Sequence, residues 1–218
     1  SMQVSSIRFN PKNPSIVYAG TGDRDAGNRN QRGVLKSTDG GVSWNLSSTG
    51  MGNRVVGMLA INPNNPDTIL AATNSGVYRT LNAGVNWTRV SSDTSHFKDV
   101  VYKPGDPQYA YATANGDFYR STNWGASWTK ITSGLPTDGT RGVIAVSPNS
   151  VSSVYFVLVK GRAYKGTYQS TNSGTSFTVK STTPNIMDYS TTGSGTSGQG
   201  WYNLDAATDP NNIDDLYV

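Results

Sequence analysis

The eight residues Ser37-Thr38-Asp39-Gly40-Gly41-Val42-Ser43-Trp44 carry a pattern that returns three more times along the chain. Each copy has a hydroxyl residue first, Asp or Asn third, Gly fifth and an aromatic residue eighth. The copies begin at residues 37, 80, 121 and 170, so their spacing is 41 to 49 residues. A period of this size indicates stacked or radially arranged supersecondary units. The conserved positions of the pattern are Ser37, Asp39, Gly41 and Trp44; Thr80, Asn82, Gly84 and Trp87; Ser121, Asn123, Gly125 and Trp128; and Ser170, Asn172, Gly174 and Phe177.

Each residue type in the pattern has a physical role in a tight turn between two strands. The side-chain oxygen at the third position can accept hydrogen bonds from backbone N–H groups a few residues ahead. Glycine at the fifth position suits a backbone with positive φ. We expect the aromatic residue to bury itself against the neighbouring unit.

The pattern S/T-x-D/N-x-G-x-x-W/F resembles the Asp box, or BNR repeat, of sialidase-type and related β-propellers. The resemblance implies that each box joins the third and fourth strands of a blade, on the face away from the binding site. Asp39 is therefore expected to be structural and not catalytic. Trp124, at a variable position of the third box, is expected to pack; stacking on a sugar is the alternative.

A strand, a Pro turn and a second strand precede each box, as in Met58–Pro63 with Thr68–Ala72. The sequence thus predicts an all-β fold of four-stranded blades: four blades and half of a fifth, as part of a larger propeller of roughly six to eight blades. The expected blades are residues 3–50, 51–94, 95–135 and 136–185, with a partial blade at 201–218. Ser1-Met2 looks like a cloning remnant. The exposed inner strands predict association with the rest of the propeller or with a second chain.

Composition excludes several classes of function. The 218 residues carry a net charge of +4 with 15% charged residues, and no Lys/Arg run points to nucleic acid. Because the chain has no Cys and one His, we expect no thiolate metal site, no His-based metal centre and no His-containing catalytic triad. No segment predicts membrane insertion. We expect no cofactor. The Gly- and Tyr-rich, weakly charged chain looks like a secreted or cell-surface bacterial protein.

Candidate site residues lie in the loops opposite the boxes, which join the second strand to the third and one blade to the next. The first such loop contains Asp23, Arg24, Asp25, Arg29 and Arg32. This mixture suits hydrogen bonding to sugar hydroxyls or carboxylate catalysis; a self-satisfied loop and a divalent-cation loop are the alternatives. Further candidate cations directly precede the first strands of later blades: Arg54, His96 with Lys98, and Arg141. Two candidate aromatic residues follow the last complete blade, Tyr189 and Trp201. Converging cations would favour an anionic ligand.

The whole chain also resembles sortilin-type propellers and the xyloglucanases of glycoside hydrolase family 74, through Tyr18-Ala19-Gly20-Thr21-Gly22-Asp23 and the Lys-Ser-Thr-Asp-Gly-Gly-x-x-Trp run. In the xyloglucanases an aspartate in such a context is catalytic, and the resemblance makes Asp23 the first catalytic candidate and Asp25 the second. The second catalytic acid of that family comes from a second propeller domain. The Arg-Ile-Pro motif of sialidases is absent from the sequence.

The sequence therefore favours a binding or interaction module for a glycan or a protein. A xyloglucanase-like endo-β-glucanase fragment is the first alternative, and a structural scaffold is the second.

Overall fold

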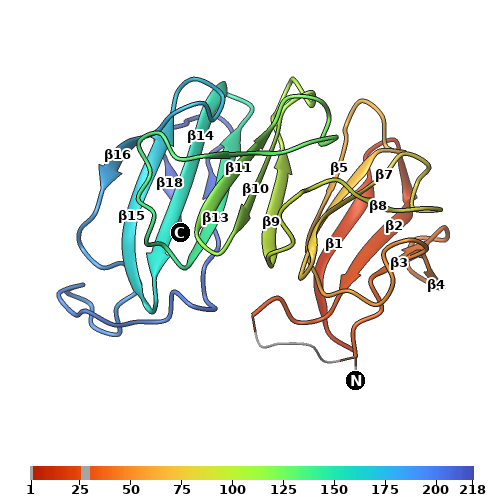
Figure 1. Cartoon of the computed structure of the whole chain (residues 1–218), viewed down its shortest axis with the longest axis horizontal. Helices are drawn as coiled ribbons and strands as arrows, with labels where there is room; N and C mark the ends of the chain where they lie inside the picture. The colour runs from red at the N-terminus through yellow and green to blue at the C-terminus, as the bar shows by residue number, and fades with distance from the viewer. Residues whose placement is uncertain (1, 26–29) are drawn as a thin grey trace.

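The computed structural model describes residues 2–25 and 30–218, and within them it contains strands and turns only. Four antiparallel sheets of four strands follow one another along the chain, and a two-stranded sheet comes last. In Figure 1 the sheets stand side by side in chain order, from β1 in red to the blue C-terminal segment. The strands are β1 (Val4–Asn10), β2 (Asn13–Thr21), β3 (Val34–Ser37) and β4 (Asn45–Leu46); β5 (Val56–Ile61), β6 (Ile69–Thr73), β7 (Gly76–Thr80) and β8 (Thr88–Arg89); β9 (Phe97–Tyr102), β10 (Ala110–Ala114), β11 (Asp117–Ser121) and β12 (Thr129–Ile131); β13 (Arg141–Ser147), β14 (Ser150–Lys160), β15 (Ala163–Ser170) and β16 (Thr178–Ser181); and β17 (Ala207–Thr208) with β18 (Leu216–Tyr217).

Each repeated eight-residue pattern forms the turn between the third and fourth strands of its sheet, and we call it the octapeptide turn. In the first copy Ser37 Oγ donates to Asp39 Oδ1 over 2.6 Å, and the N–H groups of Gly41 and Ser43 donate to these two side chains. The same three hydrogen bonds recur in the turns that begin at Thr80, Ser121 and Ser170. Hydrogen bonds from Ser37 and Ser43 hold the pKa of Asp39 well below its ordinary value.

The turns between first and second strands also repeat. The Oδ1 atom of Asn62 accepts the N–H groups of Asn64 and Asn65, at 2.9 and 3.2 Å. Asn10 and Asp209 form the same pair of bonds with residues two and three positions ahead. A proline directly after the Asn or Asp has its φ fixed and donates no N–H, which suits a turn.

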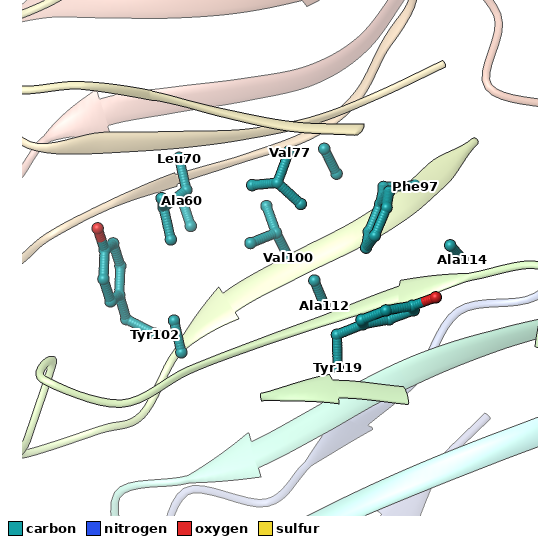
Figure 2. Packing of buried hydrophobic residues seen from close by; sticks show 11 residues of the cluster. Ala60, Leu70, Val77, Phe97, Val100, Tyr102, Ala112, Ala114 and Tyr119 are labelled. Carbon is teal, nitrogen blue, oxygen red and sulfur yellow. The ribbon is translucent and has the colours of Figure 1, made fainter. Parts of the chain in front are cut away.

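The hydrophobic core is a series of layers between consecutive sheets. One layer lies between β5–β8 and β9–β12, where Ala60, Leu70 and Val77 face Val100 and Phe97 (Figure 2). Equivalent layers lie on both sides, around Tyr18 and Trp87 before it and around Phe118 and Phe156 after it. A smaller layer, with Val157, Met187 and Leu204, joins β13–β16 to the last segment. The core therefore depends on stacking sheet against sheet.

The octapeptide turns also bind each sheet to the one before it. Lys36, Arg79 and Arg120 each lie directly before the octapeptide turn of their own sheet. Each donates to the backbone oxygen of the fourth residue in the octapeptide turn of the next sheet. These residues are Ala83, Trp124 and Ser173, at 2.9, 3.3 and 2.7 Å. A Cβ added to the fifth-position glycine would clash with the preceding sheet in three turns, at 2.3 Å from Ser47 Oγ for Gly84 and at 2.5 Å from Leu70 for Gly125. Gly174 meets Tyr111 in the same way. Glycine is thus required by close approach as well as by positive φ.

The expected burial of the eighth residue is correct for three turns and wrong for the first. Trp87 and Phe177 are buried, and Trp128 packs against the layer of Figure 2. Trp44 is 38% exposed, and its indole N–H donates to Gly41 O within its own turn. Each of the other aromatic residues packs on the preceding sheet, and among the described residues no sheet precedes β1–β4, so Trp44 is not covered in this way. Ile7, Phe9 and Leu46 of this sheet are exposed as well.

The predicted all-β fold of four four-stranded blades and half of a fifth is confirmed. No helix capable of spanning a membrane occurs in the described part of the chain.

Replacing Arg120 with Ala should lower the free energy of unfolding by about 1–2 kcal/mol, because the charge-assisted bond to Ser173 O and the contact of the guanidinium with the Tyr109 ring, 5.0 Å from its centroid, are both lost. Urea denaturation measures this change. Arg89→Ala, at an exposed position of β8, is the control and should change stability by no more than about 0.5 kcal/mol. Equal effects of the two substitutions would show that the bond between sheets contributes nothing specific.

Replacing Asp39 with Asn should reduce the acid sensitivity of the fold. Since the pKa of Asp39 is lower in the folded than in the unfolded chain, its contribution to stability is present above the unfolded pKa of about 4 and is lost as the pH falls below it. Asn keeps the turn, as the other three copies show, but does not titrate. Urea midpoints at pH 6 and pH 3 should therefore differ less in Asp39→Asn than in the wild type; an unchanged difference would contradict the assignment.

Candidate functional site

Asp25 is the centre of a group of charges on the face opposite the octapeptide turns. Its Oδ1 lies 3.0 Å from Lys98 Nζ and 3.2 Å from Arg141 Nη1, and its Oδ2 lies 3.3 Å from Arg24 Nε. Lys98 lies in β9 and Arg141 begins β13, which are the first strands of consecutive sheets. The loop after β2 thus reaches across to two other sheets. In Figure 1 the described parts of this loop and the blue segment after β16 lie along the same lower edge.

Arg141 is the most deeply buried cation of the group. It is 3% exposed, and its Nη2 donates to Leu204 O over 3.2 Å. Burial lowers the pKa of Arg141, and the Asp25 carboxylate acts in the opposite direction. The Nε and Nη1 atoms donate no hydrogen bond to the described residues, although Nη1 lies within ion-pair distance of Asp25. A buried guanidinium therefore retains hydrogen-bonding capacity that the described chain does not use.

Two further titratable groups adjoin this group of charges. Burial raises the pKa of Asp99, whose Oδ2 accepts the N–H of Ile144 over 2.9 Å. Burial also lowers the pKa of His96 to about 4, and Lys98 adds to the effect. His96 is therefore neutral at pH 7 and adds no positive charge to the site.

A hollow of about 490 Å³ opens beside these charges. Its lining residues come from five loops or strand ends: Asp25, Lys98, Thr140, Arg141, Gly161, Arg162 and Trp201. Trp201 is 43% exposed and packs against Tyr202, with the ring centroids 4.2 Å apart. Arg162 is exposed and forms no ion pair with the described residues. Three cations and one carboxylate thus surround a space that an aromatic ring borders.

Asp23 lies two residues before Asp25 in the sequence, but it does not line the hollow. Its Oδ1 accepts the N–H of Asp25 over 2.8 Å, and Gln3 Nε2 lies 3.5 Å from its Oδ2. These contacts make Asp23 a residue that shapes the loop holding Asp25.

Among the other predicted residues, the structure brings Lys98, Arg141, Arg24 and Trp201 together around Asp25 or the hollow. Arg32 lines a separate recess with Met2 and Leu46, and Arg54 is exposed away from the hollow. Tyr189 is exposed, and its hydroxyl donates to Gly198 O over 3.2 Å. Arg29 lies outside the described residues.

Sequence reasoning missed Arg162 and Thr140. Arg162 lies in the short connection between β14 and β15, which joins a second strand to a third and so belongs to the predicted binding face. That position was the available signal, but the connection is much shorter than the first loop, which was the feature that marked a candidate site. Thr140 directly precedes Arg141 and carried no signal of its own.

The described residues contain no group of three or more His, Cys, Asp or Glu side chains that could hold a metal ion. Asp25 contacts three cations, an arrangement that opposes binding of a divalent ion between Asp23 and Asp25.

Comparisons with known proteins place the fold. No protein-family model matches the chain, and no curated protein matches it. Among solved structures, an ancestral GH74 enzyme superimposes with a TM-score of 0.70 and 22% identity, over 96% of this chain and 26% of that one. YCF48 from Cyanidioschyzon merolae gives 0.56 and 14%, over 84% of this chain and 58% of that one. YCF48 bound to D1 peptide gives 0.57 and 11%, over 99% and 68%.

The chain thus spans about a quarter of the length of the ancestral GH74 enzyme. At these identities the similarity establishes the β-propeller fold and leaves the activity to the site itself.

Replacing Asp25 with Ala should lower the free energy of unfolding by about 2–4 kcal/mol, because Arg141 would remain buried without its ion pair. Lys98→Ala, which removes a more exposed partner of the same carboxylate, should cost about 1 kcal/mol or less. Urea denaturation of both variants measures the difference. If Asp25→Ala is as stable as Lys98→Ala, the ion pair does not hold Arg141 in place.

Proposed function

We propose that this chain is a recognition module of a larger propeller that binds an anionic group of a glycan in the hollow beside Asp25. The observation that carries the proposal is the set Arg141, Arg162 and Trp201 around one open space. Arg141 offers a buried Nε that donates no hydrogen bond to the described residues, beside an Nη1 that is ion-paired with Asp25, and Arg162 offers an exposed guanidinium. A carboxylate or sulfate group on a sugar accepts hydrogen bonds from such a fork.

Trp201 supports a sugar as the carrier of that anionic group. Its half-exposed indole borders the hollow, and the apolar face of a sugar ring stacks on an aromatic face. The volume of about 490 Å³ lies within the range of small-ligand pockets. An acidic saccharide would place its ring over Trp201 and its anionic group toward Arg162 and Arg141.

The octapeptide turns support a wider assignment. Their shared hydrogen-bond pattern agrees with the Asp-box resemblance, so we infer a place among the Asp-box propellers, which include the sortilin type. The low charge content agrees with a secreted or cell-surface bacterial protein.

A glycoside hydrolase is the second candidate, supported by the GH74-like fold and by the sequence context of Asp23. Hydrolysis needs two carboxyl groups about 5 to 9.5 Å apart across the scissile bond. Asp25 is the only carboxylate among the lining residues, and three cations hold it. The recognition role therefore agrees better with this geometry.

Calorimetric titration with polygalacturonate and with its fully methyl-esterified form tests the proposal, because the two polymers differ only in charge. We expect binding of the charged form alone, weakened about tenfold by Arg162→Ala and by Trp201→Ala, or roughly 1.4 kcal/mol for each. Lys180→Ala removes an exposed cation of β16 outside the hollow and should change affinity less than about twofold.

Equal binding of the two polymers would show that the carboxylate is not recognised, and the proposal would fail. Equal losses in Arg162→Ala and Lys180→Ala would show that the basic surface binds polyanions without a site. Release of reducing ends from xyloglucan that is lost in Asp23→Asn would support the hydrolase instead.

A further inference from the structure

Trp124 has a backbone conformation that disfavours a large side chain. It is the fourth residue of the third octapeptide turn, and its φ is +57°. The residues at the same position in the other turns are Gly40, Ala83 and Ser173, with φ of +76°, +54° and +56°. All three are small, because the left-handed region crowds a side chain against the backbone. A tryptophan at this position has a steric cost that Gly40 avoids, and its side chain is the largest of the four.

The Trp124 ring is only partly buried. The residue is 50% exposed, whereas Trp87, at the eighth position of the second turn, is 2% exposed. The indole N–H of Trp124 donates no hydrogen bond to the described residues, but that of Trp87 donates to Ser47 O over 2.8 Å. Trp87 therefore has a structural role that Trp124 lacks. An unfavourable conformation that presents a half-exposed ring points to a functional role for that ring.

A cavity of about 330 Å³ lies beside the Trp124 ring, between the second and third sheets on the face of the octapeptide turns. The preceding sheet supplies the rest of its lining, with Asn62, Asn64, Asn65 and Thr68 from the connection between β5 and β6, and Arg79 and Leu81 from β7 and the turn after it. The cavity is thus distinct from the hollow at Asp25.

Hydrogen bonds fix the walls of this cavity. Asn62 Oδ1 accepts the N–H groups of Asn64 and Asn65, and Asn65 Nδ2 donates to Thr68 Oγ1 over 3.3 Å. Arg79 Nη1 donates to Trp124 O over 3.3 Å, which ties the strained turn to the neighbouring sheet. The Asn64 side-chain amide has no hydrogen-bond partner among the described residues. A preformed cavity with free amide and indole groups costs little to organise around a ligand.

We propose that Trp124 and Asn64 form a second binding site, for a neutral saccharide. The lining carries amides, a hydroxyl and one cation but no carboxylate, so it matches a ligand rich in hydroxyl groups and without net charge. The indole face can stack on the C–H face of one sugar ring, while the Asn64 amide and the indole N–H bond its hydroxyls. The volume lies at the low end for ligand pockets, which fits one or two rings.

Titration of the ¹⁵N-labelled chain with cellotetraose, mannotetraose and N-acetylchitotetraose tests this second site. The observable is the indole N–H resonance of Trp124, assigned from its loss in Trp124→Gly. We expect at least one of the three sugars to shift this resonance in a saturable manner. Asn64→Ala should weaken that binding about fivefold to tenfold.

Trp124→Gly separates binding from folding. Glycine adopts positive φ without steric cost, so this variant should be as stable as the wild type or more stable, while its affinity for the sugar falls at least tenfold. Val42→Ala, at an exposed position of the first octapeptide turn, is the control and should leave affinity unchanged. A lower unfolding midpoint of Trp124→Gly would show that the ring is a packing residue, and the proposal would fail.

Two further outcomes would overturn the second site. One is no shift of the Trp124 resonance with any of the three sugars at 20-fold or greater molar excess over the protein. The other is a shift caused by a proline-rich peptide and by no sugar, which would identify the occupant as a protein segment. Binding of polygalacturonate at the hollow should be the same in Trp124→Gly as in the wild type, so each site can fail without the other.

Discussion

The structure depends on one repeated interaction between consecutive sheets, which the octapeptide turn makes. In each of the last three turns a backbone carbonyl accepts a hydrogen bond from a cation of the preceding sheet, while the fifth-position glycine approaches that sheet too closely for a Cβ. The aromatic residue at the eighth position then fills the layer between the two sheets. Because the sheets are small, and the three main layers of the core each lie between two of them, this interaction fixes the spacing on which those layers depend.

The same stacking assembles the hollow at Asp25. Lys98 and Arg141 lie at corresponding ends of first strands in neighbouring sheets, and the loop after β2 brings Asp25 between them. Burial of Arg141 without a counter-ion would be costly, so the Asp25 carboxylate offsets that cost as well as bordering the hollow. Exposed Arg162 and Trp201 then provide groups whose interactions are still available to a ligand. The buried ion pairs of Asp25 stabilise the site, whereas Arg162 and Trp201 are exposed and available for contact with a ligand.

The two faces of the molecule differ in chemistry for a structural reason. On the loop face, connections vary in length, so charged residues from several sheets can meet. On the turn face, the octapeptide pattern fixes most positions, and variation is confined to residues such as the fourth, where Trp124 stands. The cations at the hollow favour an anionic ligand, whereas the amides beside Trp124 favour a neutral one.

The sequence by itself determined the fold, because local hydrogen bonds within eight residues define each turn and recur at blade spacing. It also identified the loop face and most members of the charge group, including Asp25, Lys98, Arg141 and Trp201. The tertiary structure was needed to show that Asp25 pairs with Lys98 and Arg141, that His96 is a neutral, half-buried group, and that Arg162 lines the hollow. These outcomes depend on which side chains of different sheets come into contact, and on how far burial removes each titratable group from water. Neither the contacts nor the burial can be read from the spacing of residues within one turn or loop.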